Sequence, residues 1–234
     1  MSIYIIEGPI GAGKTTLLKY LYEYFTKLGY KTAICLEPVD LWEKIGILGK
    51  FYQNPERYSY IFQSFVYITR IDKIKEMFKT CPNYDIYLIE RSPLSDKLFM
   101  AIQHNDLMEL EMYKNWCNTF DQLLPFDLSN VKLIYLKPDI EICQQRIAKR
   151  NRSSESNIKH EYQEKLIIAH NYYFENIPIP DDFKNDINID LLNKCPILQQ
   201  NVITIDHNII NNDYTIDAYY EKLLLDKINV IAKN

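Results

Sequence analysis

A phosphate-binding loop stands at the beginning of the chain. The segment GPIGAGKT, residues 8–15, fits the pattern Gly-x-x-x-x-Gly-Lys-[Ser/Thr]. A short apolar, β-branched run precedes it at residues 2–7, and an amphipathic helical pattern begins at Thr16. This order of strand, loop and helix suits phosphate binding, because backbone N–H groups and the helix N-terminus then face the anion. The sequence therefore predicts a nucleoside-triphosphate site.

Each residue type in the loop has a role in such a site. Glycines let the backbone turn around phosphate oxygens, Lys14 would reach the outer phosphates, and Thr15 would offer its hydroxyl to Mg²⁺. The predicted ATP-binding residues of this segment are Gly8, Gly11, Ala12, Gly13, Lys14, Thr15 and Thr16. The alternative is a chance match in a glycine-containing turn.

Composition narrows the class of protein. The chain has 234 residues, of which 47% are hydrophobic and 25% charged, as expected for one globular domain spanning residues 1–234. Its net charge of -4 does not suit a protein that coats nucleic acid. No apolar run approaches the length of a membrane span, and no leader pattern precedes the first strand. Five scattered cysteines indicate reduced thiols in a cytoplasmic protein.

Strand and helix patterns alternate along the chain. Strands are expected at residues 2–7, 31–36, 86–89, 132–136 and 202–205. Helices are expected at residues 16–28, 40–48, 55–79, 93–124, 139–149, 159–174 and 215–232. This alternation implies a three-layer α/β fold with a central five-stranded parallel sheet and helices on both faces. Residues 175–201 are interpreted as a surface excursion, in which residues 189–192 could form a short helical turn.

Polar residues follow the second and third predicted strands. Glu37 comes after the second, and Glu90 and Arg91 end the third. Taken alone, Glu37 could be a solvated turn residue, and Glu90 and Arg91 could form an ion pair at a helix start. Together with the P-loop, however, they lie at one edge of the predicted sheet, where ligands bind in parallel α/β folds. Phosphoryl transfer needs a proton acceptor for the attacking hydroxyl and cations for the moving phosphoryl group. Glu37 suits the first role and Arg91 the second, while Glu90 would help Thr15 to hold Mg²⁺.

A basic cluster ends the helix after the fourth predicted strand. It contains Arg146, Arg150 and Arg152. By itself it is typical of a helix C-terminus, where cations complement the dipole. In a chain with a P-loop, we interpret residues 150–158 as a lid whose arginines bind ATP and exclude water.

With these motifs in this order, the chain resembles the deoxyribonucleoside kinase family, whose members include deoxycytidine, deoxyguanosine and insect multisubstrate kinases. The motifs are the P-loop, Glu37-Pro-Val with Trp42 five residues on, Tyr52, Phe62-Gln63, Glu90-Arg91-Ser92 and RNRSSE at residues 150–155. The resemblance covers nearly the whole chain and is weakest at residues 175–201 and after Asp206. It implies a salvage enzyme that transfers the terminal phosphoryl of ATP, with Mg²⁺, to a deoxynucleoside 5′-hydroxyl.

The resemblance also implies a nucleoside pocket. Its expected members are Glu37, Trp42, Tyr52, Phe62, Gln63, Arg70, Arg91, Asp96 and Glu155. Gln63 can pair with a base edge, and Phe62 and Trp42 would supply apolar walls. Tyr52 and Glu155 would share the sugar 3′-hydroxyl. The alternatives are core positions for the two aromatic residues and a helix-surface position for Gln63.

Arg70 and Asp96 bear on the choice of base. In the resembling family this pair marks members that accept deoxycytidine or purine deoxynucleosides, whereas thymidine-preferring members carry smaller or apolar residues. A cation and a carboxylate would suit a cytosine amino group or a purine edge and would crowd a thymine methyl. The alternative is a simple interhelical salt bridge.

The chain departs from the family pattern in three places. Ser154 stands where many members have a second acidic residue, and Met100 where the deoxycytidine-kinase type has an aromatic pocket wall. Residues 207–212 match the adenine-binding loop poorly, which leaves the donor triphosphate open. In the resembling family, two helices from each subunit form a four-helix homodimer interface. The apolar residues 107–124 and 166–174 could form this interface or could belong to the core.

Other classes of P-loop protein were weighed. A thymidylate-kinase-like enzyme would carry Asp-Arg at the end of the third strand, where this chain has Glu90-Arg91-Ser92. A GTPase switch would need Asp-x-x-Gly and Asn-Lys-x-Asp, which are absent, and a motor would need a hydrophobic run ending in Asp-Glu. A binding protein without catalysis would not need Lys14, Glu37 and Arg91 together.

Overall fold

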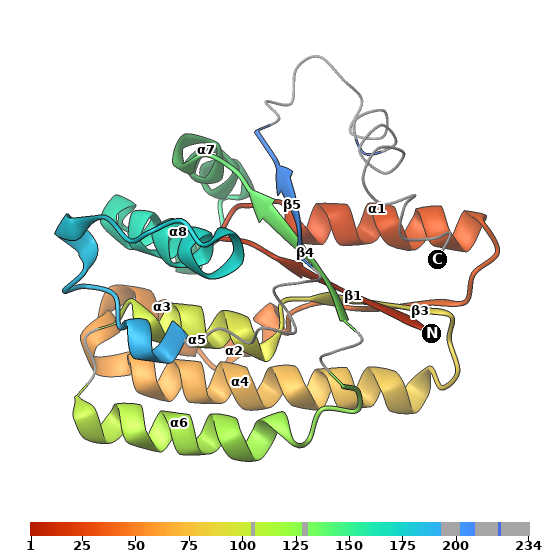
Figure 1. The fold of residues 1–234 in the computed structure, drawn as a ribbon, viewed down its shortest axis with the longest axis horizontal. Helices are drawn as coiled ribbons and strands as arrows, with labels where there is room; N and C mark the ends of the chain where they lie inside the picture. The colour runs from red at the N-terminus through yellow and green to blue at the C-terminus, as the bar shows by residue number, and fades with distance from the viewer. Residues whose placement is uncertain (104–105, 128–130, 193–201, 209–219, 221–234) are drawn as a thin grey trace.

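A single parallel sheet forms the centre of the molecule. The computed structural model describes residues 1–103, 106–127, 131–192, 202–208 and 220. Its strands are β1 (Ser2–Glu7), β2 (Thr32–Cys35), β3 (Ile86–Glu90), β4 (Val131–Lys137) and β5 (Val202–Asp206). They lie in the order β2-β3-β1-β4-β5, and each neighbouring pair is parallel. The predicted five-stranded parallel sheet is therefore confirmed (Figure 1).

Helices cover both faces of this sheet. They are α1 (Lys14–Lys27), α2 (Val39–Lys44), α3 (Ile47–Gln53), α4 (Pro55–Thr80), α5 (Pro93–Ala101), α6 (Leu107–Asp121), α7 (Ile140–Arg150) and α8 (His160–Glu175). Three 3₁₀ turns, η2 (Ser153–Glu155), η3 (Asp181–Phe183) and η4 (Ile189–Leu192), complete the described elements. Figure 1 shows α1 on one side of the sheet, α4 on the other, and α6 outside α4. The three-layer prediction is confirmed.

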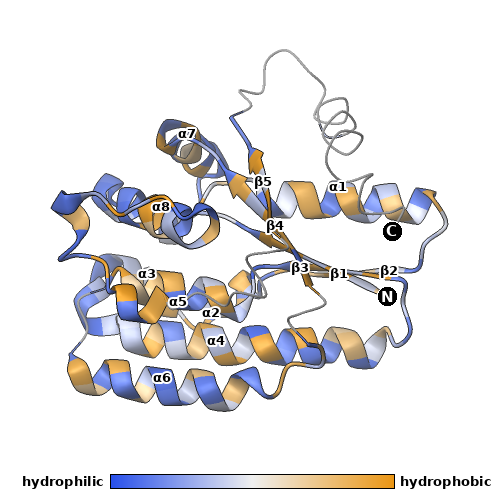
Figure 2. Cartoon of the chain, in the orientation of Figure 1, coloured by the Kyte–Doolittle hydropathy of each residue, from blue (hydrophilic) through white to orange (hydrophobic). Residues whose placement is uncertain are grey.

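The two faces of the sheet form two separate cores. Because successive strand residues point to opposite faces, Ile3 and Ile5 pack with α4, α5 and α8, whereas Tyr4 and Ile6 pack with α1. Both faces are therefore apolar, as is typical of a parallel sheet covered by helices. Figure 2 shows the strands as mostly hydrophobic and the helices as mixed. Glu7 continues the face of Ile3 and Ile5, so its carboxylate points into the α4 side of the molecule.

Two predicted helices are each divided in the structure. The helix expected at residues 40–48 is interrupted at Gly46, whose left-handed backbone (φ 74°) ends α2 and starts α3. The helix expected at residues 93–124 ends first at Ala101. A second helix then begins beyond Asp106, whose carboxylate accepts a hydrogen bond from the Glu109 N–H (2.8 Å). Both predictions of one continuous helix are wrong because a local cap outweighs the apolar pattern.

The segment interpreted as a surface excursion packs on the body of the protein as far as residue 192. Its apolar residues Ile179, Ile187, Leu191 and Leu192 are buried. The Asn188 N–H also donates to the Ala101 carbonyl (2.7 Å) at the end of α5. Residues 193–201 and the predicted terminal helix, except for residue 220, lie outside the described residues.

Two further expectations concern the whole chain. In the part of the chain that the structure describes, no helix has the length and apolar character needed to cross a bilayer. The described cysteines, Cys35, Cys81, Cys117 and Cys143, are all free thiols, as predicted.

Candidate active site

A cavity of about 510 Å³ opens at the carboxyl ends of β1, β2 and β3. This volume is typical of a small-molecule site. The whole predicted nucleoside pocket lines it: Glu37, Trp42, Tyr52, Phe62, Gln63, Arg70, Arg91, Asp96 and Glu155. The predicted phosphate-binding residues that line it are Gly11, Gly13, Lys14, Thr15, Thr16, Glu90, Arg146, Arg150 and Arg152. Gly8 and Ala12 do not line it; Ala12 lies in the core beside α1.

The P-loop backbone depends on its glycines. Gly11 and Gly13 have left-handed φ angles of 79° and 93°. A Cβ on Gly11 would lie 2.5 Å from the Cys143 carbonyl oxygen, so α7 approaches the loop too closely for any side chain. The Arg146 guanidinium donates to the Gly11 and Ala12 carbonyls (3.4 and 3.0 Å), which ties α7 to the same loop.

Lys14 is held inside the loop. Its Nζ donates to the Gly8 and Pro9 carbonyls (3.2 and 2.9 Å), and the side chain is buried. Burial, and next the positive charge of Arg91, lower the pKa of Lys14 from 10.5 to about 7. An anion bound in the loop would therefore favour the protonated lysine.

Thr15 and Glu90 meet across the sheet edge. The Thr15 Oγ1 donates to the Glu90 Oε1 (2.6 Å), and burial together with the charge of Glu37 raises the pKa of Glu90. Hydroxyl and carboxylate oxygens are ligands that Mg²⁺ accepts. No cluster of three His, Cys, Asp or Glu exists among the described residues. A Mg²⁺ held here would therefore complete its shell with phosphate oxygens and water.

Glu37 lies between two buried arginines. Its Oε1 is 2.5 Å from the Arg70 Nη2 and 3.4 Å from the Arg91 Nε. Burial by itself would raise the pKa of Glu37, but the charges of Arg91, Arg70 and Lys14 together hold it below 4.5. Glu37 is therefore an ionised carboxylate across the neutral and mildly acidic range.

Arg70 connects this carboxylate with a second one. Its other terminal nitrogen, Nη1, makes an ion pair with the Asp96 Oδ2, deep in the cavity. Burial raises the pKa of Asp96 to about 6, although Arg70 opposes that rise. The sequence placed Arg70 and Asp96 together but did not show that Arg70 also binds Glu37. That link requires α4 to cross beneath the end of β2, which only the tertiary structure provides.

Apart from the ion-paired Arg70 Nη1 and Asp96 Oδ2, three polar atoms at this end of the cavity have no hydrogen-bond partner among the described residues. They are the Gln63 Nε2 and the Arg70 Nε, both donors, and the Asp96 Oδ1, an acceptor. All three residues are almost fully buried. A buried polar group without a partner destabilises the protein, so these atoms indicate a site for a ligand with matching acceptor and donor groups.

Aromatic rings form the wall beside Gln63. The Trp42 and Phe62 rings meet edge to face at 6.0 Å, and the Phe51 ring stacks on Phe62 at 4.6 Å. The Trp42 Nε1 donates to the Thr69 Oγ1 (3.0 Å), which fixes the indole against α4. Trp42 and Phe62 are core residues that also line the cavity, and Phe51 supports them from within the core.

The predicted lid folds back over the cavity. Glu155 accepts from the Arg150 Nη2 (2.6 Å) and the Arg152 Nη1 (2.8 Å). The Ser154 Oγ donates to the Glu43 Oε1 (2.7 Å) on α2, so the residue that departs from the family pattern contacts the far rim. The lid arginines thus face a carboxylate of the lid itself.

Some residues that line the cavity were not predicted, among them Phe99, His207 and Tyr220. Phe99, rather than its neighbour Met100, lines the cavity, and the Arg91 guanidinium lies 4.8 Å from the Phe99 ring centroid. His207 lies beyond the end of β5, with its Nε2 3.0 Å from the Tyr220 hydroxyl. Burial lowers the pKa of His207 to about 4. The strand-end rule could have found His207, whereas no local signal distinguishes Phe99 from Met100.

Comparison with known proteins agrees with this geometry. A family model described as deoxynucleoside kinase matches residues 4–229. A deoxyadenosine/deoxycytidine kinase of Bacillus subtilis (strain 168) is 29% identical, with 95% of this chain and 91% of the relative covered. Deoxycytidine kinase 1 of Xenopus laevis is 28% identical, with 95% and 87% covered. A probable deoxycytidine kinase of Fowlpox virus (strain NVSL) is 29% identical, with 78% and 81% covered.

The match extends over all five strands and every described helix, and it includes the cavity residues at the ends of β1, β2 and β3. The chain belongs to the deoxynucleoside kinase family and is an ATP-dependent phosphotransferase.

Proposed function

We propose that this kinase transfers the terminal phosphoryl group of ATP to the 5′-hydroxyl of a deoxynucleoside and favours deoxycytidine or purine deoxynucleosides over thymidine. The observation that carries the proposal is one cavity with a P-loop at one end and the unpartnered Gln63 and Asp96 atoms at the other. Glu37 and Arg91 lie between these two ends. The names of the relatives, which include deoxycytidine and deoxyadenosine kinases, support the same substrates.

At the phosphate end, this chain's own residues would bind and neutralise the triphosphate. Backbone N–H groups of the P-loop and the N-terminus of α1 would bind phosphate oxygens. Lys14, Arg146, Arg150 and Arg152 would supply cations, and Thr15 and Glu90 would hold Mg²⁺. The metal would contribute charge neutralisation of the phosphate oxygens.

Between the two ends, Glu37 would accept the proton of the 5′-hydroxyl. Glu37 is ionised at neutral pH, which a group that accepts a proton requires, although the cations that lower its pKa also make it a weaker base. Arg91 remains cationic and would stabilise charge on the phosphoryl group. The ion pairs with Arg70 and Arg91 hold the Glu37 side chain in place.

At the nucleoside end, the unpartnered atoms support the choice of base. The Gln63 Nε2 can donate to a ring nitrogen, and the Asp96 Oδ1 can accept from an exocyclic amino group. Cytosine and adenine present that acceptor and donor side by side, and guanine presents its N3 beside its 2-amino group. Thymine presents a carbonyl oxygen where the amino group would be, and this oxygen would face the Asp96 carboxylate. Tyr52 and Glu155 remain the proposed partners of the sugar 3′-hydroxyl.

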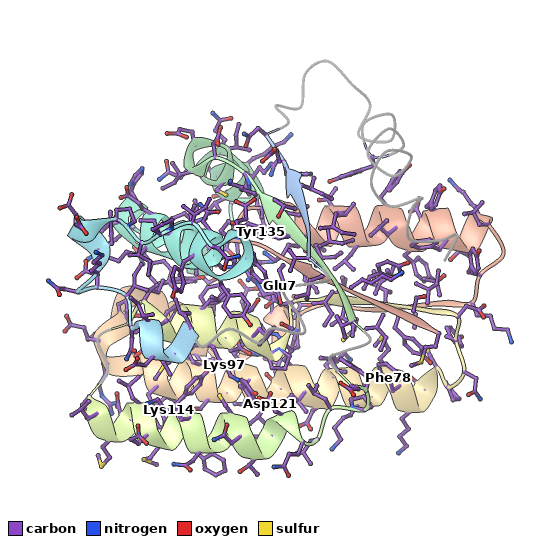
Figure 3. All side chains as sticks on the ribbon, in the orientation of Figure 1. Glu7, Phe78, Lys97, Lys114, Asp121 and Tyr135 are labelled. Atoms are coloured by element: carbon purple, nitrogen blue, oxygen red, sulfur yellow. The ribbon has the colours of Figure 1, made fainter. Side chains whose placement is uncertain are left out.

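We also propose that the protein forms a homodimer through α6 and α4. Asp121, Lys97 and Tyr67 tie α6 to α5 and α4, through a Tyr67–Asp121 hydrogen bond and a Lys97–Asp121 ion pair (3.2 Å) (Figure 3). Away from this contact, the apolar side chains exposed on α6 and neighbouring α4 are Ile61, Leu107, Met108, Met112 and Trp116. The other candidate segment, residues 166–174, is unsuited, because Leu166, Ala169, Tyr173 and Phe174 are buried.

The proposed reaction can be tested with a coupled assay that measures ADP release. The assay is run with each of the four deoxynucleosides, with thymidylate, and without an acceptor. Deoxycytidine and the purine deoxynucleosides should stimulate ADP formation, thymidine should do so less, and thymidylate should not. Stimulation by thymidylate and by no nucleoside would contradict the proposal.

Replacing Glu37 by Gln keeps the shape of the side chain and removes its basicity. The kcat should fall by about 10²-fold or more, with little change in nucleoside KM. Steady-state kinetics measure both quantities, and Glu23→Gln, at an exposed position of α1, controls for the charge change. A near-normal kcat in Glu37→Gln would show that Glu37 is not the proton acceptor, and Glu90 would then be the next candidate.

The role of Arg70 and Asp96 in the choice of base can be tested by replacing both residues, as Arg70→Met with Asp96→Ala. The ratio of kcat/KM for deoxycytidine over thymidine should fall in this double variant. Each single variant should be less stable than the double one, since it leaves a buried charge unpaired at a cost of about 3–5 kcal/mol. The matched control removes the exposed Lys73–Glu76 pair (2.8 Å) on the same helix, as Lys73→Met with Glu76→Ala. An unchanged ratio in the double variant would make the pair a structural salt bridge only.

The homodimer can be tested by sedimentation equilibrium. The wild-type protein should have twice the chain mass of 27.9 kDa, and Met108→Glu with Met112→Glu should have the chain mass. Lys114→Glu, two residues from Met112 and therefore on another side of α6, should stay dimeric. A wild-type protein at the chain mass would overturn the proposal.

A further inference from the structure

Glu7 is a buried carboxylate to which the proposed mechanism assigns no role. It is the last residue of β1, directly before the P-loop, and it has no solvent exposure. Figure 3 labels it near the centre of the molecule, on the α4 side of the sheet. An ionised side chain at such a position is costly unless its oxygens are hydrogen-bonded. Its partners therefore indicate what it does.

Among the described residues, the partners of Glu7 lie at the start of α5, where Ser92 is the N-cap and Ser95 belongs to the first turn of the helix. Its Oε1 accepts from the Ser92 N–H (2.8 Å) and the Ser92 Oγ (2.5 Å). Its Oε2 accepts from the Ser95 Oγ. Ser92 and Ser95 are also fully buried, so these contacts are shielded from water.

The direction of each hydrogen bond follows from the second partner of each serine. The Ser92 Oγ accepts from the Leu94 N–H (3.1 Å), as the cap of α5, so its own proton points to Glu7. The Ser95 Oγ accepts from the Arg91 Nη1 (3.4 Å), so its proton also points to Glu7. Both oxygens of Glu7 must therefore be acceptors, a requirement that only a carboxylate meets.

Arg91 needs such support because its backbone is unusual. Its φ angle is 64°, in the left-handed region that residues other than glycine rarely adopt. Its N–H donates to the Ile6 carbonyl (3.0 Å) of β1, one residue before Glu7. The end of β1 thus holds both the backbone of Arg91 and, through Ser95, its guanidinium. The guanidinium in turn lies 3.4 Å from Glu37.

We propose that Glu7 is a positioning residue for Arg91, acting through Ser95. Its carboxylate accepts the hydrogen bond of the Ser95 hydroxyl, so a lone pair of that hydroxyl faces the Arg91 guanidinium. Because Glu7 directly precedes the P-loop, it thereby fixes the position of Arg91 relative to the P-loop. This inference rests on the proposed function, in which Arg91 stabilises the moving phosphoryl group.

A glutamine at position 7 cannot reproduce this pattern. With its amide nitrogen toward Ser95, the amide and Arg91 would both donate to one hydroxyl, whose proton would then lack an acceptor. With the amide nitrogen toward Ser92, two N–H donors would face each other. Either orientation displaces the turn that carries Arg91, and a displacement of about 1 Å near a reacting group can cost about 10²-fold in rate.

The test measures kcat, nucleoside KM, ATP KM and thermal stability for Glu7→Gln, Ser95→Ala and their combination. We expect kcat to fall by about 10²-fold in Glu7→Gln and about tenfold in Ser95→Ala. Both KM values should stay within about twofold of wild type, since Arg91 acts on the transition state. The combined variant should lose no more than Glu7→Gln does, because the two residues act in series.

Matched controls are Glu23→Gln for the charge change and Ser59→Ala for the loss of a buried hydroxyl on α4. Losses that multiply in the combined variant, or that fall on KM as much as on kcat, would overturn the proposal. If Glu7→Gln does not fold, Ser95→Ala decides, and a wild-type kcat in that variant would overturn it. A wild-type enzyme inactive on nucleosides would instead refute the proposed function, before any variant is compared.

Discussion

The parallel pairing of β1 with β3 and β4 is the constraint on which the site depends. The sheet has apolar residues on both faces, so helices must cover it on both sides, and its strands all run in one direction. All carboxyl ends then lie at one edge. With the order β2-β3-β1-β4-β5, the strands that lead to Glu37, Arg91 and the P-loop are neighbours. Residues more than fifty positions apart in the chain thereby share one cavity.

Charge balance then sets the properties of that cavity. Arg70 and Arg91 are buried, Arg70 pairs with the buried Asp96, and both arginines pair with Glu37, whose side chain is 14% exposed. Removing either partner would leave an unpaired charge in a low-dielectric environment, so these groups depend on one another. The same environment lowers the pKa of Lys14, raises that of Glu90 and lets the nearby cations lower that of Glu37. One buried network thus supports different protonation behaviour in residues a few ångströms apart.

Contacts at helix ends position the lid and the turn that carries Arg91. Ser92 caps α5 and also donates to Glu7, so the turn that carries Arg91 is attached both to its own helix and to β1. The lid is attached in a different way, through Glu155 to its own arginines and through Ser154 to α2. The first attachment lies in the interior and the second at the rim. The turn that carries Arg91 is thus attached in part through its backbone, whereas the described contacts of the lid with Glu43, and the ion pairs of Glu155 with Arg150 and Arg152, are made by side chains.

The sequence by itself determined the α/β alternation, the P-loop and the strand-end residues Glu37, Glu90 and Arg91, because these follow from local periodicity and from a motif with fixed spacing. The apolar pattern predicted one helix where the structure has two, at residues 40–48 and again at residues 93–124, because it continues past Gly46 and Asp106, where a new helix is capped. Only the tertiary structure decided that Arg70 links Glu37 with Asp96, that Phe99 lines the cavity, and that Glu7 reaches Ser95. These contacts join distant segments, and their geometry depends on how helices pack on the sheet, which no single stretch of sequence encodes.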